Sequence, residues 1–326
     1  MRVQSRPRLE DIAEQTGLSV ATVSRALHRD DSPYVSVRTR TRVREVAQRL
    51  GYRPDARARS LAMGSSRLIN IWLDEVYSPY YSHLCQELHR ITADSGYCQA
   101  VQTALPNPGW GVADGLADGL IVIDALESLD ALRGGRDTPS VPTVTLGIEA
   151  KEGIDAVILD LRPGVTALVQ HLLTQFDGPL LGFTSPYDVR WQIFEDACKA
   201  AGREYTLVRR PDIRRDVIRE FFRDWIRKNG APSAIFCHND DAAMAVCRAI
   251  FDLGLRIPED IGIAGCDDLE EGRYLATPIT TIGAPAKAMC EAAWELLQNR
   301  IKKPDSSVRH ITIPSELIIR ESTQRK

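Results

Sequence analysis

Residues 9–28 read LEDIAEQTGLSVATVSRALH and hold two short amphipathic helical patterns with a turn between them. The first pattern places its apolar side chains on one face: Leu9, Ile12 and Ala13. Gly17 follows this face and suits the left-handed conformation that ends many helices, and Ser19 is the expected N-cap of the next helix. The second pattern again shares one apolar face: Val23, Ala26 and Leu27. The stretch therefore predicts a helix, a tight T-G-L-S turn and a second helix.

A third helical pattern follows between Ser36, a further expected N-cap, and Gly51, an expected stop. Its apolar side chains have helical spacing: Val43, Val46, Ala47 and Leu50. Arginines occupy its outer sides: Arg38, Arg40, Arg42, Arg44 and Arg49. Three short helices with this turn form a helix-turn-helix pattern. A small three-helix subdomain that binds nothing is the alternative interpretation of the pattern alone.

The outer face of the second helix carries small side chains, where a surface helix normally carries long charged ones. Val20, Ala21 and Ser24 lie there together with Arg25 and His28. A helix that enters a DNA major groove about 12 Å wide needs such a slim face, and Arg25 can bond guanine O6 and N7 together. Val20 and Ala21 can contact thymine methyl groups. The face therefore predicts base reading by this helix.

Hydroxyl side chains near the helix starts suit DNA phosphates, which set the register without reading sequence. They are Ser19, Thr22, Ser24, Ser36 and Thr39. Residues 55–62 form a further predicted helix of about two turns, which carries Arg57, Ala58 and one large apolar side chain, Leu61. Because this helix has so little to bury, we expect it to fold against a partner, with Leu61 wedged into a minor-groove base step. A flexible linker is the alternative.

Charge is segregated along the chain. Residues 1–67 hold 14 arginines and 7 acidic residues, a net charge of +7, whereas the remaining residues have a net charge of −10. A basic head on an acidic body is typical of a nucleic-acid-binding segment joined to a different module. The chain has neither a secretion signal at its start nor a run of roughly 18 apolar residues, so we expect a cytoplasmic protein without membrane contact.

Several chemistries lack their sequence signals. The seven cysteines are scattered without metal-ligand spacing, and we expect them to be small reduced core residues. His171 and His238 are isolated and are interpreted as structural. The chain shows no catalytic triad, P-loop or nucleophile elbow. We therefore expect no enzyme activity, no cofactor and no metal site; an enzyme built on the acidic body is the alternative that these signals disfavour.

From residue 68 onward, short apolar runs alternate with helical patterns. The runs are LINIWL, AVQTA, GLIVI, VPTVTLG, AVILD, PLLGFT, AIFCH and DIGIAG. Such alternation predicts an α/β fold of parallel sheets covered by helices. The remaining length of about 260 residues is enough for two such lobes.

Ligands of open α/β sheets bind beyond the carboxyl ends of the strands. The segments that follow the apolar runs are polar: 74–81, Asp160, Arg190, Asn239 with Asp240, and Asp267 with Asp268. Carboxylates, an arginine and an amide opposite tyrosines suit a polyhydroxylated ring. Capping of the next helix is the favoured alternative for Asp240 and an open one for Asp268. Tyr80 and Tyr81 have core packing as their alternative.

The sequence resembles the lactose-repressor-type (LacI/GalR) family of transcriptional regulators. The head segments LEDIAEQTGLSVATVSRALH, VSVRTRTRVREVAQRLGYRP and ARSLA carry the resemblance, and DGLIVID, AIFCHND and LGLRIPEDIGIAGCDDL follow in the family's order. The resemblance implies an N-terminal helix-turn-helix head and hinge helix, followed by a two-lobed periplasmic-binding-protein-like core. It also implies that Val20, Ala21 and Arg25 read bases and that Leu61 intercalates.

The resemblance further implies a division of the chain into a head (1–53), a hinge helix (54–64), a first lobe (67–161 and 284–312) and a second lobe (162–283 and 313–326). It implies effector ligands between the lobes: Tyr80, Tyr81, Asp160, Arg190, Asn239 and Asp267. The implied function is a homodimeric or tetrameric repressor on a pseudo-palindromic double-stranded DNA operator, controlled by a sugar or sugar derivative. The alternatives are a corepressor-dependent regulator that binds a nucleobase or sugar phosphate, and a solute-binding protein without a DNA function.

The chain departs from the family pattern in three places. The loop HRDDSPYV is longer than usual, Asp212-Ile213 stands where an aromatic wall is expected, and the glycine-rich segment 106–117 suggests a trimmed helix. A basic stretch from Arg209 to Arg227 has two interpretations. It is either an anion site or, as its interleaved carboxylates favour, a solvated helix.

Overall fold

The computed structural model describes residues 7–28, 34–53, 64–74, 76–103, 117–127, 129, 141–184, 188–209 and 211–325. The chain divides into two compact units, Met1–Ser66 and Arg67–Lys326. The predicted hinge helix and the glycine-rich segment before Ala117 lie outside the described residues.

The first unit packs α1 (Leu9–Thr16), α2 (Val20–His28) and α3 (Val37–Leu50) around a small apolar core. The buried residues of this core are Ile12, Ala13, Val23, Ala26, Val35, Val43, Val46 and Ala47. Gly17 and Gly51 end α1 and α3 in the left-handed conformation, with φ of 67° and 68°. The predicted helices, inner faces and glycine stops of the head are therefore confirmed.

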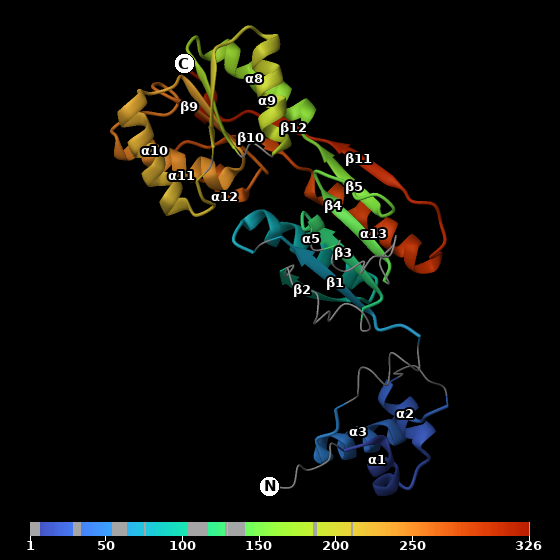
Figure 1. The fold of residues 1–326 in the computed structure, drawn as a ribbon. Coiled ribbons are helices and arrows are strands. Elements are labelled where there is room, and N and C mark those ends of the chain that lie inside the picture. The colour runs from blue at the N-terminus through green and yellow to red at the C-terminus, as the bar shows by residue number, and fades with distance from the viewer. Residues whose placement is uncertain are drawn as a thin grey trace. The chain divides into compact units, whose positions relative to one another are not determined.

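The second unit contains two six-stranded sheets in its described part (Figure 1). The first sheet has the order β11-β5-β4-β3-β1-β2 and the second has the order β12-β10-β9-β8-β6-β7. The first sheet consists of β1 (Leu68–Leu73), β2 (Cys98–Thr103), β3 (Gly119–Ile123), β4 (Thr143–Gly147), β5 (Asp155–Asp160) and β11 (His310–Pro314). The second consists of β6 (Leu180–Thr184), β7 (Tyr205–Arg209), β8 (Ala234–Cys237), β9 (Gly262–Cys266), β10 (Thr280–Gly283) and β12 (Glu316–Ile318).

All described neighbouring strands are parallel except β12, which runs antiparallel to β10. The central strands β3, β4, β6, β8 and β9 are buried along their whole length. Burial on both faces explains why these strands occur in the sequence as continuous apolar runs.

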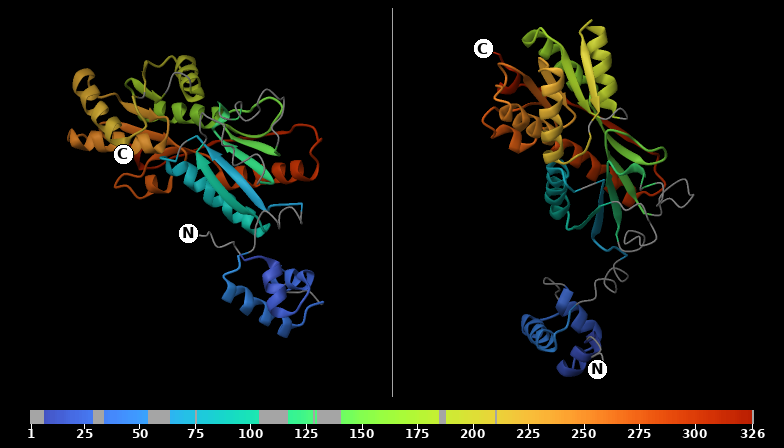
Figure 2. Two further views of the ribbon diagram at one scale, coloured as in Figure 1. Left: turned by 60° about the horizontal axis from the view of Figure 1, so that its bottom comes forward. Right: turned by 60° about the vertical axis from the view of Figure 1, so that its left-hand side comes forward.

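Helices cover the sheets. In the first lobe, α5 (Pro79–Asp94) and α13 (Ala286–Lys302) pack on the first sheet. In the second lobe, α8 (Arg162–Gln175) and α9 (Val189–Ala200) cover one face, and α10 (Arg215–Asn229) and α11 (Asp240–Asp252) cover the other. Figure 2 shows the two helix pairs on opposite sides of the second sheet, in yellow-green and orange. The predicted α/β class is confirmed. The remaining short elements are α12 (Glu270–Arg273) and a 3-10 turn (Glu321–Thr323).

The chain passes between the two sheets three times in the described part: between β5 and α8, between β10 and α13, and between β11 and β12. Ile313 and Pro314 still pair with Leu159 and Asp160 in the first sheet, so the last passage falls just after the expected residue 313. These adjacent connections join the two lobes and leave the carboxyl ends of their parallel strands at a common cleft.

Two features differ from the expectations. The sequence pattern did not predict four of the strands: β7, β10, β11 and β12. Of these, β7, β11 and β12 lie at a sheet edge, where the apolar signal is weak, and β10 lies next to an edge. The expectation that all cysteines are core residues is wrong for Cys98, which is exposed on the edge strand β2, and Cys85 is half-buried. Within the described part, no helix combines the length and apolarity that crossing a membrane requires.

Candidate DNA-reading helix and ligand cavity

The outer face of α2 is accessible. Val20 is 38% exposed, and Ala21 and Arg25 are exposed as well, whereas Val23 and Ala26 on the opposite face are fully buried. The residues expected to read bases thus lie on the solvent side of the helix. Ser24 is half-buried rather than fully outward. His28 ends α2, and its side chain lies outside the described residues.

The hydroxyl groups expected near phosphates hold the starts of α2 and α3. Ser19 Oγ accepts a hydrogen bond from Thr22 N at 3.2 Å, and Ser36 Oγ accepts one from Thr39 N at 3.1 Å. The two hydroxyls of each pair are also within 2.9 Å and 2.8 Å of each other, respectively. Ser19 and Ser36 therefore cap the two helix starts, and the hydroxyls of Thr22 and Thr39 contact the capping hydroxyls. Arg57, Ala58 and Leu61 lie outside the described residues.

A cavity of about 540 Å³ opens between the lobes of the second unit. Its lining includes five of the six residues expected to bind an effector: Tyr80, Tyr81, Arg190, Asn239 and Asp267. Asp160 is not among the lining residues. Its Oδ1 instead accepts a hydrogen bond from Arg162 N at 2.9 Å, at the start of α8. The structure thus gives Asp160 a local capping contact in place of a position in the cavity.

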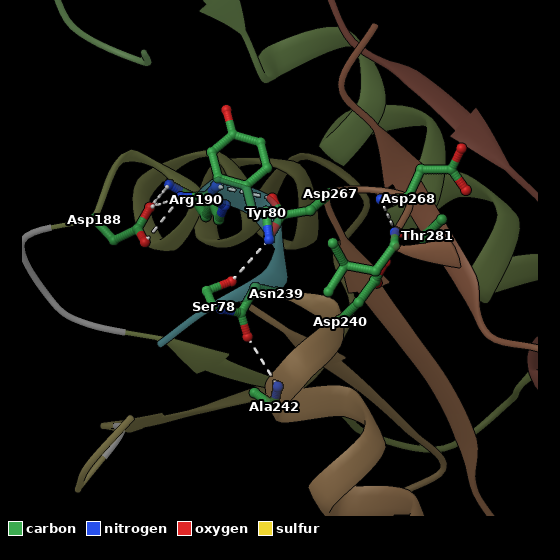
Figure 3. Close-up of polar contacts among 11 residues, drawn as sticks. Ser78, Tyr80, Asp188, Arg190, Asn239, Asp240, Ala242, Asp267, Asp268 and Thr281 are labelled. Atoms are coloured by element: carbon green, nitrogen blue, oxygen red, sulfur yellow. Dashed lines mark hydrogen bonds and ion pairs between the residues drawn. The ribbon is translucent and has the colours of Figure 1, made fainter. Parts of the chain in front are cut away.

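Arg190 is held firmly in the first turn of α9. Asp188 is the N-cap of this helix and accepts hydrogen bonds from Arg190 N at 2.8 Å and from Arg190 Nη1 at 3.1 Å and 3.2 Å. Arg190 Nη2 lies 3.9 Å from Asp267 Oδ1 (Figure 3). Burial opposes the charge of Arg190, but Cys266, Asp188 and Asp267 together raise its pKa well above the ordinary value. The guanidinium therefore stays charged inside the cavity.

The start of α11 differs from the favoured expectation. Asn239, not Asp240, is the N-cap, and its Oδ1 accepts a hydrogen bond from Ala242 N at 2.9 Å. This cap leaves the amide hydrogens of Asn239 for other partners. The capping interpretation of Asp240 is wrong because β8 ends at Cys237 and the helix begins at Asp240, which places the cap one residue earlier.

Asp240 instead lies fully buried against the sheet. It accepts hydrogen bonds from Thr281 Oγ1 at 2.7 Å and from Leu269 N at 2.8 Å (Figure 3). Burial raises the pKa of Asp240 well above its ordinary value. Gly265 makes room for this carboxylate, since a Cβ there would meet Asp240 Oδ1 at 2.0 Å.

Asp268 is not a helix cap either. The short helix α12 has Leu269 at its N-cap, without a side-chain cap. The Asp268 carboxylate instead contacts the guanidinium groups of Arg273 and Arg320. Asp268 is thereby neutralised outside the cavity lining.

Asp124 is a cavity residue that the sequence analysis missed. It directly follows β3, has a left-handed φ of 56°, and lies over Gly147, where a Cβ would meet its Oδ1 at 2.1 Å. Burial raises the pKa of Asp124 to about 6, although the charge of Arg190 and hydrogen bonds from Ile148 N–H and the Tyr81 hydroxyl oppose this shift. The position after the apolar run GLIVI was the available signal, by the same rule that selected Asp267.

Asp267 faces the cavity from the second lobe. Its side chain is 7% exposed and follows β9 with φ of 110°. Burial raises the pKa of Asp267 to about 7, and the nearby carboxylate of Asp124 adds to this shift while Arg190 opposes it. Two carboxylates from opposite lobes are thus close enough to influence each other.

Tyr80 and Tyr81 lie in the first turn of α5, after the N-cap Ser78. Their rings meet edge to face, with centroids 5.4 Å apart. Both line the cavity and also pack against the core of the unit, so the two interpretations of these residues are compatible. Burial raises the pKa of Tyr80 well above its ordinary value, and Asp124 and Asp267 add to the shift.

Other expected features also have places in the structure. Ile213 lines the cavity at the position of the missing aromatic wall. His238 also lines the cavity, and its ring packs edge to face with Phe183. His171 Nε2 lies 2.8 Å from Thr323 Oγ1.

Several arginines of the basic stretch from Arg209 to Arg227 pair with carboxylates of the protein: Arg214, Arg215, Arg219 and Arg227. These pairs support the solvated-helix interpretation of that stretch.

A helix-turn-helix head joined to a two-lobed unit with a polar cavity between its lobes defines a class of DNA-binding protein that also accommodates a small ligand. Comparison with known proteins identifies two domains in the chain. Residues 8–55 match "Bacterial regulatory proteins, lacI family", and residues 180–323 match "Periplasmic binding protein-like domain". The chain thus joins a lacI-family DNA-binding domain to a periplasmic binding protein-like domain, which is the composition of a DNA-binding transcriptional regulator.

Relatives and solved structures span nearly the whole chain. HTH-type transcriptional regulator PtxS of Pseudomonas putida is 28% identical, with 98% of this chain and 97% of the relative covered. The ribose operon repressor of Escherichia coli is 26% identical, with coverage of 96% and 99%. The lac repressor dimer bound to operator and the anti-inducer ONPF has the same fold, with a TM-score of 0.78 at 22% identity and coverage of 98% and 100%. The relatives are named as transcriptional regulators rather than enzymes.

Proposed function

We propose that this protein is a repressor that binds operator DNA through α2, and that its affinity for the operator changes when a small effector binds in the cavity. One observation carries the proposal. The same chain has an exposed face of small side chains on α2 and a polar cavity between two lobes. Three adjacent connections join these lobes. A solute-binding protein would have no use for the head, which is why we favour regulation.

DNA recognition would use the exposed face of α2. Arg25 donates to guanine O6 and N7, Val20 and Ala21 contact thymine methyl groups, and the capped helix starts contact phosphates. One such helix binds weakly, so two heads of a homodimer engage half-sites of a pseudo-palindromic operator about one helical turn apart. The segment 54–64, with Leu61, folds in the minor groove between the two heads.

The effector would be a sugar or sugar derivative. The volume of about 540 Å³ lies within the range of small-molecule sites. Arg190, Asn239 and Asp267 provide planar groups for pairs of hydroxyls, while Tyr80 and Tyr81 provide faces and edges for the apolar side of a ring. Two proteins of the same fold have been solved with sugars: one LacI-family regulator has bound ribose, and CelR is in complex with cellobiose.

Effector and DNA are coupled by lobe closure. The effector contacts side chains of both lobes, so it favours the closed arrangement over the open one. A ligand shifts such an equilibrium by the difference between its affinities for the two states. The effector therefore changes the affinity for DNA by the same factor by which DNA changes the affinity for the effector. In the inducing form of this mechanism, closure separates the paired hinge segments and the repressor leaves the operator.

A gel-shift titration of duplexes from the adjoining promoter tests the DNA half of the proposal. The Arg25→Ala variant loses a bidentate contact, and we expect it to lose about 1–3 kcal/mol of discrimination at one base pair. Arg42→Ala is the matched control: this exposed arginine of α3 is expected to change the affinity for all sequences equally, if at all. Full sequence preference in Arg25→Ala would remove the assignment of α2.

A further inference from the structure

The charge of the cavity wall discriminates between classes of effector. Among the described lining residues, one side chain, Arg190, carries a permanent positive charge. Six carry carboxylates: Asp74, Asp124, Glu127, Glu149, Asp188 and Asp267. We propose that the effector is a cation, a small hydroxylated amine of the amino-sugar type, whose ammonium group binds between Asp124 and Asp267. The proposal rests on the proposed function in taking this cavity as the effector site.

Arg190 is already neutralised by the protein. Its Nη1 donates to both oxygens of Asp188, and its Nη2 lies 3.9 Å from Asp267 Oδ1. A phosphate or carboxylate effector would have to displace these contacts and would at the same time approach the remaining acidic side chains. Like charges brought close together repel each other, and more strongly the less water lies between them. The contacts therefore make Arg190 a partner of the wall and disfavour an anionic ligand.

Asp124 and Asp267 lack full compensation of their charge. Asp124 accepts from a backbone N–H and a tyrosine hydroxyl, which are neutral donors. Asp267 shares Arg190 with Asp188, which holds the guanidinium more closely. Burial raises the pKa of Asp124 to about 6 and that of Asp267 to about 7, which means that protons are retained where a counter-cation is missing. An ammonium group supplies that counter-charge with charge-assisted hydrogen bonds.

Three further carboxyl groups of the second lobe lie outside the cavity lining: Asp240, Asp241 and Asp268. Asp240 is fully buried close to Asp267, and its hydrogen bonds come from Thr281 and a backbone N–H. The neighbouring carboxylates Asp241 and Asp268 differ, because arginines pair with both. Burial favours the protonated, neutral form of Asp240, so the negative charge that a cation in the cavity meets comes from the lining carboxylates.

The rest of the wall favours a ring with hydroxyls over a bare alkyl amine. Asn239 and Ser78 bring polar groups to the cavity, and Leu146 and Ile148 provide an apolar surface. The Tyr80 ring lies near Asp124 and Asp267, where an aromatic group attracts an adjacent cation. A neutral sugar could occupy the same volume but would leave the acidic wall uncompensated.

Calorimetry with matched ligands on the full-length protein tests the proposal. The probes are D-glucosamine, D-galactosamine and D-mannosamine, each compared with its parent sugar and with the 6-phosphate of that sugar. We expect at least one amine to bind about tenfold more tightly than its parent, since a charge-assisted hydrogen bond is stronger than a neutral one. We also expect its affinity to fall as salt rises. Tighter binding of a phosphate or a parent sugar, or no binding of any amine at millimolar concentration, would overturn the proposal.

Isosteric variants locate the contact. Asp267→Asn is expected to weaken binding of the amine about tenfold and to change binding of the neutral parent much less. Asp177→Asn is the matched control, since Asp177 is exposed outside the cavity lining. Equal losses for amine and parent sugar in Asp267→Asn would contradict a charge contact. Circular dichroism of both variants establishes that they are folded.

The operator gel shift separates this proposal from the proposed function. If an amine binds the cavity but leaves operator binding unchanged, the charge assignment holds and the effector role fails. If a neutral or anionic sugar instead changes operator binding, the regulatory role holds and the charge assignment is wrong.

Discussion

Replacing Asp124 by asparagine should stabilise the ligand-free protein at alkaline pH. The folded-state pKa of Asp124 is about 6, raised from 3.8 chiefly by burial. Because the pKa is higher in the folded state, protonation of Asp124 stabilises the folded protein. This contribution to the free energy of unfolding is complete below pH 3.8 and is lost as the pH rises through 6. The difference of about 2 pKa units corresponds to about 3 kcal/mol, at 1.36 kcal/mol per unit. This figure is an upper value because water in the open cavity screens the charge.

Asparagine is the appropriate replacement for two reasons. It tolerates the left-handed conformation that Asp124 adopts, with φ of 56°, and its carbonyl can still accept from Ile148 N–H. The side chain stays neutral at all pH values. The variant should therefore keep its structure and lose the pH dependence that the carboxylate causes.

Urea unfolding at pH 5 and pH 8 measures the effect. The wild-type protein should lose more free energy of unfolding between these two pH values than the Asp124→Asn variant does. Asp177→Asn, an exposed position, should retain the wild-type pH dependence. Identical pH dependence in wild type and Asp124→Asn would refute the argument that this carboxylate is desolvated in the native state.

Two further predictions concern packing. Gly147→Ala places a Cβ too close to Asp124 Oδ1, so it should displace this carboxylate. Calorimetry should then show no binding of the effector, while DNA binding persists. An unchanged dissociation constant would mean that Asp124 does not contact the ligand. Ile12→Ala removes a fully buried side chain of the head, and a loss of about 2–5 kcal/mol is expected. Operator binding should then fail while effector binding in the separate second unit stays normal, and intact operator binding would show that the small core tolerates the cavity.

The sequence alone determined the head of this protein. Helical periodicity, the caps Ser19 and Ser36, and the stops Gly17 and Gly51 depend on contacts between residues a few positions apart. Such contacts can be recognised locally, and the structure confirms each of them. The continuous apolar runs likewise identified the central strands, because burial on both faces leaves a strong signal.

Tertiary structure decided the composition of the cavity. Asp160 and Asp124 both follow apolar runs, yet the α8 start draws Asp160 into a local contact while Gly147 on the neighbouring strand gives Asp124 its place. The shift of the N-cap from Asp240 to Asn239 depends on where β8 ends. The charge balance of the site likewise depends on which arginines reach which carboxylates from distant segments. Desolvation and ion pairing depend on which residues lie close together in space, and a single sequence does not give these contacts.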